Sequence, residues 1–356
     1  MYSEKEIDLI TLSALDGISG NCKYALLCEL KQDTPDVKKI ENALIKSVGS
    51  GVYNNLKAQF SDPAFRKSVL DNLEKKGITC VTKYSEYYPS LLKQTADPPL
   101  VLYCKGKVEL LKTKCFAIVG SRRCPVKTVA ETKKISGEIS QVFTVVSGIA
   151  EGGDTAAVEG ALKTGNVICV LAYGFDHVYP AMNAQLLKSV EKSGLLITEY
   201  PPEVPPKSYQ FPVRNRIIAG MSLGTLVVSA AKKSGALITA DIAQQYDREI
   251  FAFPYSVGAP AGEGCNALIK DGAHLTENIL DILNAFGLDL TLPKKQDLSG
   301  DELEAYNILL EEGETFLPNL ADRMGKQVYQ ILTVISKLEL KGKVVRLGGN
   351  VFSAVK

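Results

Sequence analysis

Arginines that could bind an anion gather in two short segments of the chain, each with glycine, serine or asparagine beside them. The first segment contains Gly120, Ser121, Arg122 and Arg123, and the second contains Phe211, Arg214, Asn215 and Arg216. Glycine lets the backbone approach an anion, and each guanidinium offers a fork that binds two phosphate oxygens at once. With asparagine for a base or sugar and phenylalanine as a stacking face, the second segment suits a strand of nucleic acid. The alternative places Phe211 in the core and leaves the arginines to cap a neighbouring helix.

Two further segments join glycine to small hydroxyl residues. The first of them runs from Ser147 and Gly148 to Asp154. The second begins with Ser234 and Gly235. A helix that starts at such a turn offers free N–H groups and the positive end of its dipole, so the Ser234 turn is a candidate anion site. For Asp154 we expect a cap on the helix that starts just after it rather than a catalytic role.

Motifs that mark several enzyme classes are missing. The chain has no Gly-x-x-x-x-Gly-Lys-Ser/Thr phosphate loop, and the glycine segment at Gly120 is not the Gly-x-Gly-x-x-Gly of a dinucleotide site. The two histidines, His177 and His274, have no partners at metal-ligand spacing, and His177 is interpreted as structural. We therefore expect a binding protein rather than an enzyme, with no cofactor and no metal.

Six short apolar runs must position these segments. They cover residues 115–119, 143–147, 167–171, 195–198, 225–228 and 250–253. Continuous apolar runs separated by helical patterns predict a parallel sheet that is covered on both faces. Right-handed crossovers then give the fold class α/β, with an extended Rossmann-like, doubly wound, mostly parallel sheet. Ligands bind at the carboxyl ends of such strands, and all four segments follow or face a strand end.

The chain is long enough for more than one domain. We predict a helical domain over 1–78, the Rossmann-like domain over 79–290, a linker over 291–300 and a winged-helix-like domain over 301–356. In the first, residues 17–20 read Gly-Ile-Ser-Gly, which favours a plain helix-helix turn over a phosphate-binding helix-hairpin-helix. In the last, helical patterns near 301–312, 317–324 and 326–341 precede two β-prone stretches around a Gly-Gly-Asn turn. Acids and bases balance there, so partner binding is as good an interpretation as DNA contact.

The net charge and the cysteines limit the kind of nucleic-acid site and the cellular compartment that we expect. The formal net charge is +1 over 356 residues, so a nucleic-acid site must concentrate its positive charge locally. Eight cysteines occur without a Cys-x-x-Cys pair, which is typical of reduced thiols in a cytoplasm. We see no secretory signal and no apolar run of about 18 residues, and we expect a cytoplasmic protein with no membrane span.

The same segments, in order, resemble the DprA/Smf family, also called DNA-processing protein A. The resemblance runs from Tyr88 to about Asn278 and rests on the Val119–Arg122, Ser147–Ala150, Tyr179-Pro180, Thr198–Pro202, Phe211–Gly220, Ser234–Ala240 and Gly264–Ala273 motifs. It implies a homodimer that binds and protects single-stranded DNA and helps to load the RecA recombinase in natural transformation. The implied DNA-binding positions are Gly120, Ser121, Arg122, Ser147, Gly148, Lys207, Phe211, Arg214, Asn215, Arg216, Ser234 and Gly235.

Departures from the family pattern lie close to these positions. Gly153 stands where the family has isoleucine, Val158 where it has histidine, Ser229 where it has glutamate and Tyr255 where it has glycine. Lys207 lies four residues before Phe211, so the loop that carries the family's lysine differs in length. These departures concern the details of a nucleotide site more than the phosphate-binding frame.

Two other functions stay open. A nucleotide phosphoribohydrolase on a related fold would need Pro-Gly-Gly-x-Gly-Thr and a following glutamate, whereas this chain has Gly-Met-Ser-Leu-Gly-Thr over 220–225 and Ser229. An interaction scaffold would leave the strand-end segments idle and recruit partners through the terminal domains.

Overall fold

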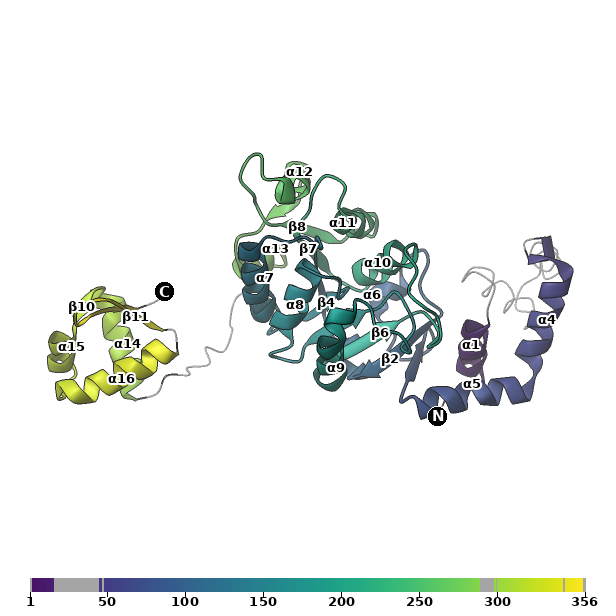
Figure 1. Ribbon diagram of the computed structural model, residues 1–356, viewed down its shortest axis with the longest axis horizontal. Coiled ribbons are helices and arrows are strands. Elements are labelled where there is room, and N and C mark those ends of the chain that lie inside the picture. The colour runs from purple at the N-terminus through teal and green to yellow at the C-terminus, as the bar shows by residue number, and fades with distance from the viewer. Residues whose placement is uncertain are drawn as a thin grey trace. The chain divides into compact units, whose positions relative to one another are not determined.

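The computed structural model describes residues 2–15, 45–46, 48–288, 298, 300–341 and 343–354 (Figure 1). The Gly-Ile-Ser-Gly turn at 17–20 and most of the expected linker lie outside the described residues. Contacts divide the chain into two units, Met1–Leu290 and Thr291–Lys356. This division does not separate the helices before residue 79 from the sheet, and the boundaries of the expected domains stay a prediction.

A nine-stranded sheet forms the centre of the first unit. Its order is β1 (Thr79–Thr82), β2 (Val101–Gly106), β6 (Leu195–Thr198), β5 (Val167–Val170), β4 (Thr144–Ser147), β3 (Cys115–Gly120), β7 (Gly224–Ser229), β8 (Glu249–Ala252) and β9 (His274–Leu275). The strands from β6 to β9 are parallel, and β1 and β2 join their edge in antiparallel pairing. The expected α/β fold with a mostly parallel sheet is confirmed, and each of the six apolar runs forms one strand.

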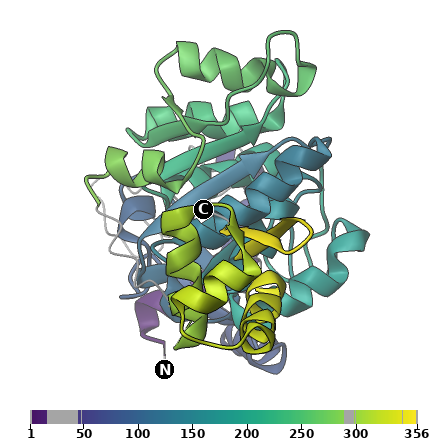
Figure 2. The same ribbon diagram turned by 90° about the vertical axis from the view of Figure 1, so that its left-hand side faces the viewer.

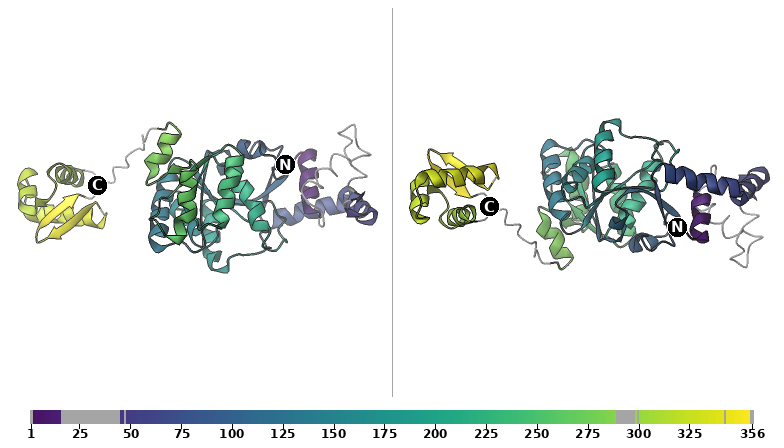
Figure 3. Two further views of the ribbon diagram at one scale, coloured as in Figure 1. Left: turned by 90° about the horizontal axis from the view of Figure 1, so that it is seen from above. Right: turned by 90° about the horizontal axis from the view of Figure 1, so that it is seen from below.

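Both faces of the sheet are buried because neighbouring residues of each strand point to opposite sides. In β3, Phe116 and Ile118 pack into one apolar cluster, and Ala117 and Val119 pack into the other. Helices line the two faces (Figure 3). Residues of α7 (Val126–Ile139), α8 (Gly153–Ala161), α9 (Ala184–Ser193) and α13 (Ile279–Ala285) pack into the first cluster. Residues of α6 (Ser90–Lys93), α10 (Gln210–Gly220), α11 (Gly235–Gln245) and α12 (Glu263–Lys270) pack into the second.

The strand order reverses between β3 and β7. From β3 the chain adds β4, β5 and β6 on one side, and it then returns to place β7 on the other side of β3. The loops that leave β3 and β7 therefore separate to opposite faces, which opens a crevice at their carboxyl ends. The segments at Gly120 and Ser234 belong to these two loops.

The helices before the sheet cover its antiparallel edge. Their bounds are Glu4–Ala14 for α1, Ser50–Ser61 for α4 and Pro63–Lys75 for α5. Leu9, Tyr53 and Phe60 pack with Cys80 of β1 and Tyr103 of β2 in a third apolar cluster. Asp62 caps α5 by accepting from the N–H of Ala64, and a proline follows the cap at the first helical position.

An ion-pair cluster also joins α5 to the loops of the sheet. The ammonium of Lys76, just after α5, lies 2.6 Å from a carboxylate oxygen of Asp176 and 3.1 Å from one of Glu203. Asp176 belongs to the loop that follows β5, and Glu203 belongs to the loop that follows β6. Asn72 of α5 donates to the same oxygen of Glu203 at 2.9 Å.

The second unit has the element order of a winged helix (Figure 2). It comprises α14 (Asp301–Glu312), β10 (Thr315–Phe316), α15 (Leu317–Arg323), α16 (Val328–Leu340), β11 (Val344–Gly348) and β12 (Val351–Ala354). The three helices and the hairpin agree with the sequence patterns, and β10 adds a third strand beside β12. Leu309, Ile335 and Phe352 are fully buried between them. In both units, no helix within the described ranges combines the length and apolarity needed to cross a membrane.

Candidate nucleic-acid interface

A cleft of about 320 Å³ lies at the reversal point of the sheet. Its walls are the loop after β3, the first two turns of α10 and the start of α11. Eight of the expected site residues line it: Gly120, Ser121, Arg122, Phe211, Arg214, Asn215, Ser234 and Gly235. The structure thus brings together segments that are more than 100 residues apart in the chain.

Glycines let the start of α8 approach the end of β3 at this cleft. A Cβ atom on Gly153 would lie 2.6 Å from the Cα of Gly120, and one on Gly120 would lie 2.9 Å from the Cα of Gly153. Gly152 has a φ of +80°, and a Cβ there would lie 2.4 Å from the carbonyl oxygen of Ser121. No side chain fits between the two backbones, so the family isoleucine could not occupy position 153 without moving them apart.

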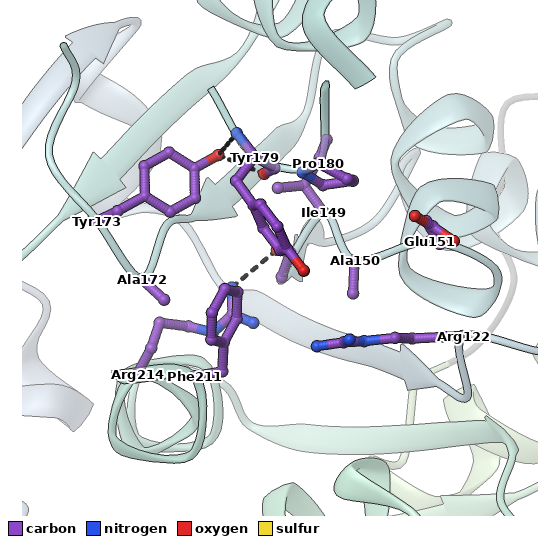
Figure 4. A pocket seen from close by; sticks show the side chains of 11 residues that line it. Arg122, Ile149, Ala150, Glu151, Ala172, Tyr173, Tyr179, Pro180, Phe211 and Arg214 are labelled. Carbon is purple, nitrogen blue, oxygen red and sulfur yellow. Dashed lines mark hydrogen bonds between the residues drawn. The ribbon is translucent and has the colours of Figure 1, made fainter. Parts of the chain in front are cut away.

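Arg122 is the exposed cation of the cleft. Its guanidinium carbon lies 5.8 Å from the ring centroid of Phe211, a cation–π distance, and Figure 4 shows its guanidinium end turned toward that ring. Among the described residues, no carboxylate forms an ion pair with Arg122. Its charge is therefore available to an anion that enters from solvent.

The start of α11 forms the opposite wall. Ser234 is the N-cap, and its hydroxyl accepts from the N–H of Ala236 at 3.3 Å. A Cβ on Gly235 would meet nothing within 4 Å, so the first turn is open on this side. Lys232 and Lys233 are exposed directly before the cap. The helix start expected from the Ser-Gly turn is present, and it adds the positive end of a helix dipole to these charges.

Helix α10 presents two faces with different roles. Phe211, Arg214 and Asn215 are three and four residues apart, so they share the face that lines the cleft. Arg216 points elsewhere: it lies 2.5 Å from Glu199 and 3.4 Å from Asp97 and does not line the cleft. Its two carboxylate partners neutralise its charge, and its role as a DNA contact stays a prediction.

Arg214 lies at the floor of the cleft and is only 4% exposed. One terminal nitrogen donates to the carbonyl oxygen of Gly148 at 2.7 Å and also to that of Val170, and Nε donates to Asn215 at 3.2 Å. These bonds hold together the ends of β4, β5 and α10. Burial lowers the pKa of Arg214 and the charge of Asp154 raises it, but an arginine stays protonated in such a site.

Asp154 is part of this floor, which corrects the expectation that it caps a helix. Helix α8 begins at Gly153 with Gly152 as its N-cap, so Asp154 lies inside the first turn. Its carboxylate accepts from the N–H of Gly120 at 3.1 Å. Burial raises the pKa of Asp154, while the charge of Arg214 and backbone N–H groups oppose that rise. The cap prediction failed because the glycine pair allows the helix to begin two residues earlier.

The remaining expected positions lie at the margins. Gly148 lines a smaller hollow on the other side of Phe211, with Tyr179, Tyr173 and Arg122 among its neighbours (Figure 4). Ser147 is fully buried, and its hydroxyl donates to the carbonyl oxygen of Ile118 at 2.7 Å. Lys207 is exposed in the loop before α10 and is not among the cleft-lining residues. Sequence reasoning did not assign Tyr179 to the site, although its Tyr-Pro motif follows a strand end.

Ser229 and Tyr255, two of the departures from the family pattern, form a hydrogen-bonded group behind the cleft. The Ser229 hydroxyl lies 2.9 Å from that of Ser121 and donates to the carbonyl oxygen of Ala261 at 3.0 Å. The Tyr255 hydroxyl donates to the carbonyl oxygen of Val228 at 2.7 Å. A Cβ on Gly262 would lie 1.9 Å from the Tyr255 ring, so the two residues fit only as a pair. Val158, the departure at the histidine position, is fully buried in the core.

A pattern typical of a hydrolase nucleophile occurs between α10 and β7. Residues 220–224 read Gly-Met-Ser-Leu-Gly, the pattern of a nucleophile elbow, but they lead from a helix into a strand rather than from a strand into a helix. Ser222 is fully buried and donates to the carbonyl oxygen of Ile218 at 2.8 Å. The described part of the chain contains no group of three or more side chains placed to hold a metal ion.

Comparisons with known proteins agree with this architecture. The family model described as DNA recombination-mediator protein A matches residues 79–287. Protein Smf of Escherichia coli is 36% identical over 309 residues, which is 80% of this chain and 80% of its own length. The X-ray structure of DNA processing protein A from Streptococcus pneumoniae matches 80% of this chain and 98% of its own, with a TM-score of 0.66 and 30% identity.

A second solved structure concerns the single-stranded DNA binding mode of DNA processing protein A from Helicobacter pylori. It matches 59% of this chain and 95% of its own, with a TM-score of 0.54 and 29% identity. The sequence resemblance is thereby confirmed: the chain belongs to the DNA recombination-mediator protein A family, the family of the proteins called DprA and Smf.

Proposed function

We propose that this protein binds single-stranded DNA in the cleft between the β3 loop, α10 and α11. The observation that carries the proposal is the combination of an unpaired, exposed Arg122 with the ring of Phe211 and the open start of α11. A cation and a helix start suit phosphates, and an aromatic face suits a base whose stack has been opened. The relative from Helicobacter pylori, whose structure concerns single-stranded DNA binding, supports the assignment.

The local charge explains how a nearly neutral chain can hold a polyanion. Arg122 and Lys233 are exposed around the cleft, and Lys232 is exposed there as well, 4.0 Å from a carboxylate oxygen of Glu263. The carboxylate that lines the cleft, Asp154, is buried and faces Arg214, and the exposed Glu151 lines the neighbouring hollow. A net charge of +1 therefore hides a local excess of positive charge at this edge of the sheet.

A salt titration tests the proposal. Labelled oligonucleotides, single- and double-stranded, are bound to the full chain between about 50 and 200 mM salt. We expect tighter binding of single strands and a linear fall of log affinity with log salt. Arg122→Ala should reduce the slope by about 0.7, so the ratio of wild-type to variant affinity shrinks by roughly 2.6-fold across this range. Equal binding of both DNA forms, or an unchanged slope, contradicts the assignment.

Arg123 offers a matched control. It is exposed beside Arg122 and does not line the cleft, and its carbonyl oxygen accepts from the Ser121 hydroxyl at 3.2 Å. Arg123→Ala removes the same charge one residue away. A larger effect of Arg122→Ala therefore reports a contact in the cleft rather than a general loss of positive potential.

We propose further that the cleft binds without catalysing a reaction. At the end of β7, where a nucleotide hydrolase would place its glutamate, Ser229 is held by Ser121 and Ala261. Asp154 is bound to the backbone of Gly120 and faces the charge of Arg214. Incubation with nucleoside monophosphates, followed by chromatography of the bases, tests this: release of free base above a buffer control would contradict it.

The family membership supports three more proposals. We propose that the protein acts in the cytoplasm, works as a homodimer and passes single-stranded DNA to the RecA recombinase. Its family is described as one of recombination mediators, and a mediator needs a recombinase as partner. Sedimentation velocity of the full chain tests the dimer, and co-precipitation with RecA, with and without oligonucleotide, tests the partnership.

A further inference from the structure

We infer that Tyr179 extends the DNA site beyond the cleft by stacking on the base next to the one that Phe211 holds. The inference rests on the proposed binding of single-stranded DNA and adds a direction to it. From the cleft, the strand would pass over the loop that follows β5 and over η2 (Ala181–Asn183).

The backbone of Tyr179 is fixed by a buried neighbour. The hydroxyl of Tyr173 donates to the carbonyl oxygen of Tyr179 at 2.5 Å and accepts from its N–H at 3.1 Å. Tyr173 itself is 1% exposed. Asn183, at the end of the same loop, donates to the carbonyl oxygen of Ile149 at 3.0 Å and to the hydroxyl of Thr155 at 2.9 Å. The loop is therefore held by hydrogen bonds at Tyr179 and at Asn183. The Tyr179 ring is thus preorganised, and little conformational freedom is lost when a ligand binds.

The ring of Tyr179 continues the aromatic wall of the cleft. Its centroid lies 5.4 Å from that of Phe211, with the planes tilted by 59°. The guanidinium carbon of Arg122 lies 5.8 Å from the centroid of the same Phe211 ring, so Arg122 and Tyr179 both contact Phe211, and Figure 4 shows Tyr179 next to it. A polyanion that binds Arg122 and stacks on Phe211 therefore has the Tyr179 ring within reach.

Two further apolar side chains are exposed on the same segment as Tyr179. Val178 is 52% exposed, Tyr179 is 39% exposed and Met182 is 73% exposed. An apolar side chain that remains exposed to water contributes no burial free energy to folding, so its surface stays available for contact with a ligand. Of these three, Tyr179 lines the small hollow that also contains Phe211, Arg122 and the exposed Glu151, so its ring is the one placed to meet a base next to the cleft.

The spacing of the rings decides where the base goes. A base between two rings needs about 3.5 Å on each side, or roughly 7 Å from ring to ring. The 5.4 Å between the centroids of Tyr179 and Phe211 is too short, and the hollow there has a volume of only about 20 Å³. The base therefore stacks on the outward face of Tyr179 and not between the rings.

The absence of tryptophan from the sequence makes a direct test available. Tyr179→Trp introduces a sole tryptophan at the inferred stacking position, and its emission is followed while oligo(dT) of about 16 nucleotides is added. Tyr246→Trp is the matched control. Tyr246 follows the last turn of α11, whose first turn lines the cleft, so the control tryptophan lies about 16 Å away along that helix.

We expect oligo(dT) to quench the tryptophan at position 179 and to leave the one at position 246 unchanged. Tyr179→Ala should weaken binding by roughly 5- to 160-fold, the range for losing one base–aromatic stack, and Tyr179→Phe should restore it. A thermal melt of Tyr179→Ala without DNA separates this effect from unfolding.

Two results would overturn the inference. In the first, wild-type protein binds oligo(dT), but Tyr179→Ala binds as tightly and the tryptophan at 179 is not quenched; the proposed function then stands and the path over Tyr179 is wrong. In the second, wild-type protein does not bind oligo(dT) at all; the proposed function then fails, and the inference falls with it.

Discussion

A methyl group added at Gly153 tests the contact that seats α8 against the end of β3. In Gly153→Ala the new Cβ would lie 2.6 Å from the Cα of Gly120 and 3.1 Å from the neighbouring backbone carbon and nitrogen. These are backbone atoms of a central strand, so they cannot rotate away as a side chain would. The start of α8 must therefore move from the strand by several tenths of an ångström or more.

The expected cost combines two opposing effects. Forcing an extra methyl group into a packed site costs about 1–3 kcal/mol. Alanine favours a helix over glycine by up to about 1 kcal/mol, which offsets part of that cost. The net loss in the free energy of unfolding should be about 1–2 kcal/mol, and for a domain of this size each kcal/mol lowers Tm by about 2–4 °C.

Gly235→Ala is the matched control. Gly235 is also the first residue of a helix, but a Cβ there would meet nothing within 4 Å. The same substitution should leave stability unchanged or raise it by about 0.4–1 kcal/mol, because the unfolded chain loses conformational freedom. The Gly235→Ala variant should keep the stability of the fold but weaken DNA binding, because it places a methyl group at the proposed DNA contact.

Urea denaturation followed by circular dichroism measures both variants, and the DNA titration is repeated on each. Unfolding of Gly153→Ala at the same urea concentration as the wild-type protein would contradict the tight contact at Gly120. A lower stability of Gly235→Ala than of Gly153→Ala would contradict it as well, since the expected difference between them rests on that contact alone.

Three other perturbations follow from the same structure. Burial alone would raise the pKa of Glu203, but hydrogen bonds from its own backbone, Lys76 and Asn72 lower it from 4.5. The Lys76 pair should therefore stabilise the fold fully above about pH 4.5 and lose this effect progressively as the pH falls below that value, so Lys76→Met should cost about 0.2–1 kcal/mol at pH 7 and clearly less in acid in urea melts. Burial raises the pKa of Cys124 from 9.0 to about 11, so its alkylation at pH 8 should be roughly 100-fold slower than that of a free cysteine, as measured on its peptide by mass spectrometry. Asp154→Asn leaves the charge of Arg214 uncompensated at the cleft floor and should cost about 3 kcal/mol in a urea melt, whereas a neutral outcome would show that the backbone carbonyls alone hold the arginine.

The arginines of α10 show how far sequence reasoning could reach. The Arg-Asn-Arg motif indicated a nucleic-acid site, and the structure places two of its residues, Arg214 and Asn215, at the cleft. Arg214 and Arg216 are two residues apart, however, so on a helix they cannot point in the same direction. The sequence did not reveal that this motif is helical, and only helical geometry separates the buried Arg214 from Arg216, which binds Glu199 and Asp97.

In the sheet, local sequence patterns revealed some strands and missed others. Each of the six apolar runs was long enough to stand out, because strands buried on both faces have no polar alternation. Strand β1 is as short as several of these, but two of its four residues are threonine, and β9 has only two residues. They owe their place to pairing with β2 and β8, and pairing partners cannot be read from a local pattern. Likewise, nothing local to Asp154 indicated that its carboxylate accepts from Gly120, 34 residues away.

The ion pairs of Lys76 bear on how the protein can be divided for experiments. Lys76 holds Asp176 on the loop that carries Tyr179, and Glu203 on the loop that leads to α10. A recombinant fragment that starts at β1 would contain every residue of the cleft but would lack this lysine. Two unpaired carboxylates would then lie on the loops beside the proposed DNA path. Such a fragment would understate the affinity of the whole protein, most strongly at low salt, where repulsion is least screened.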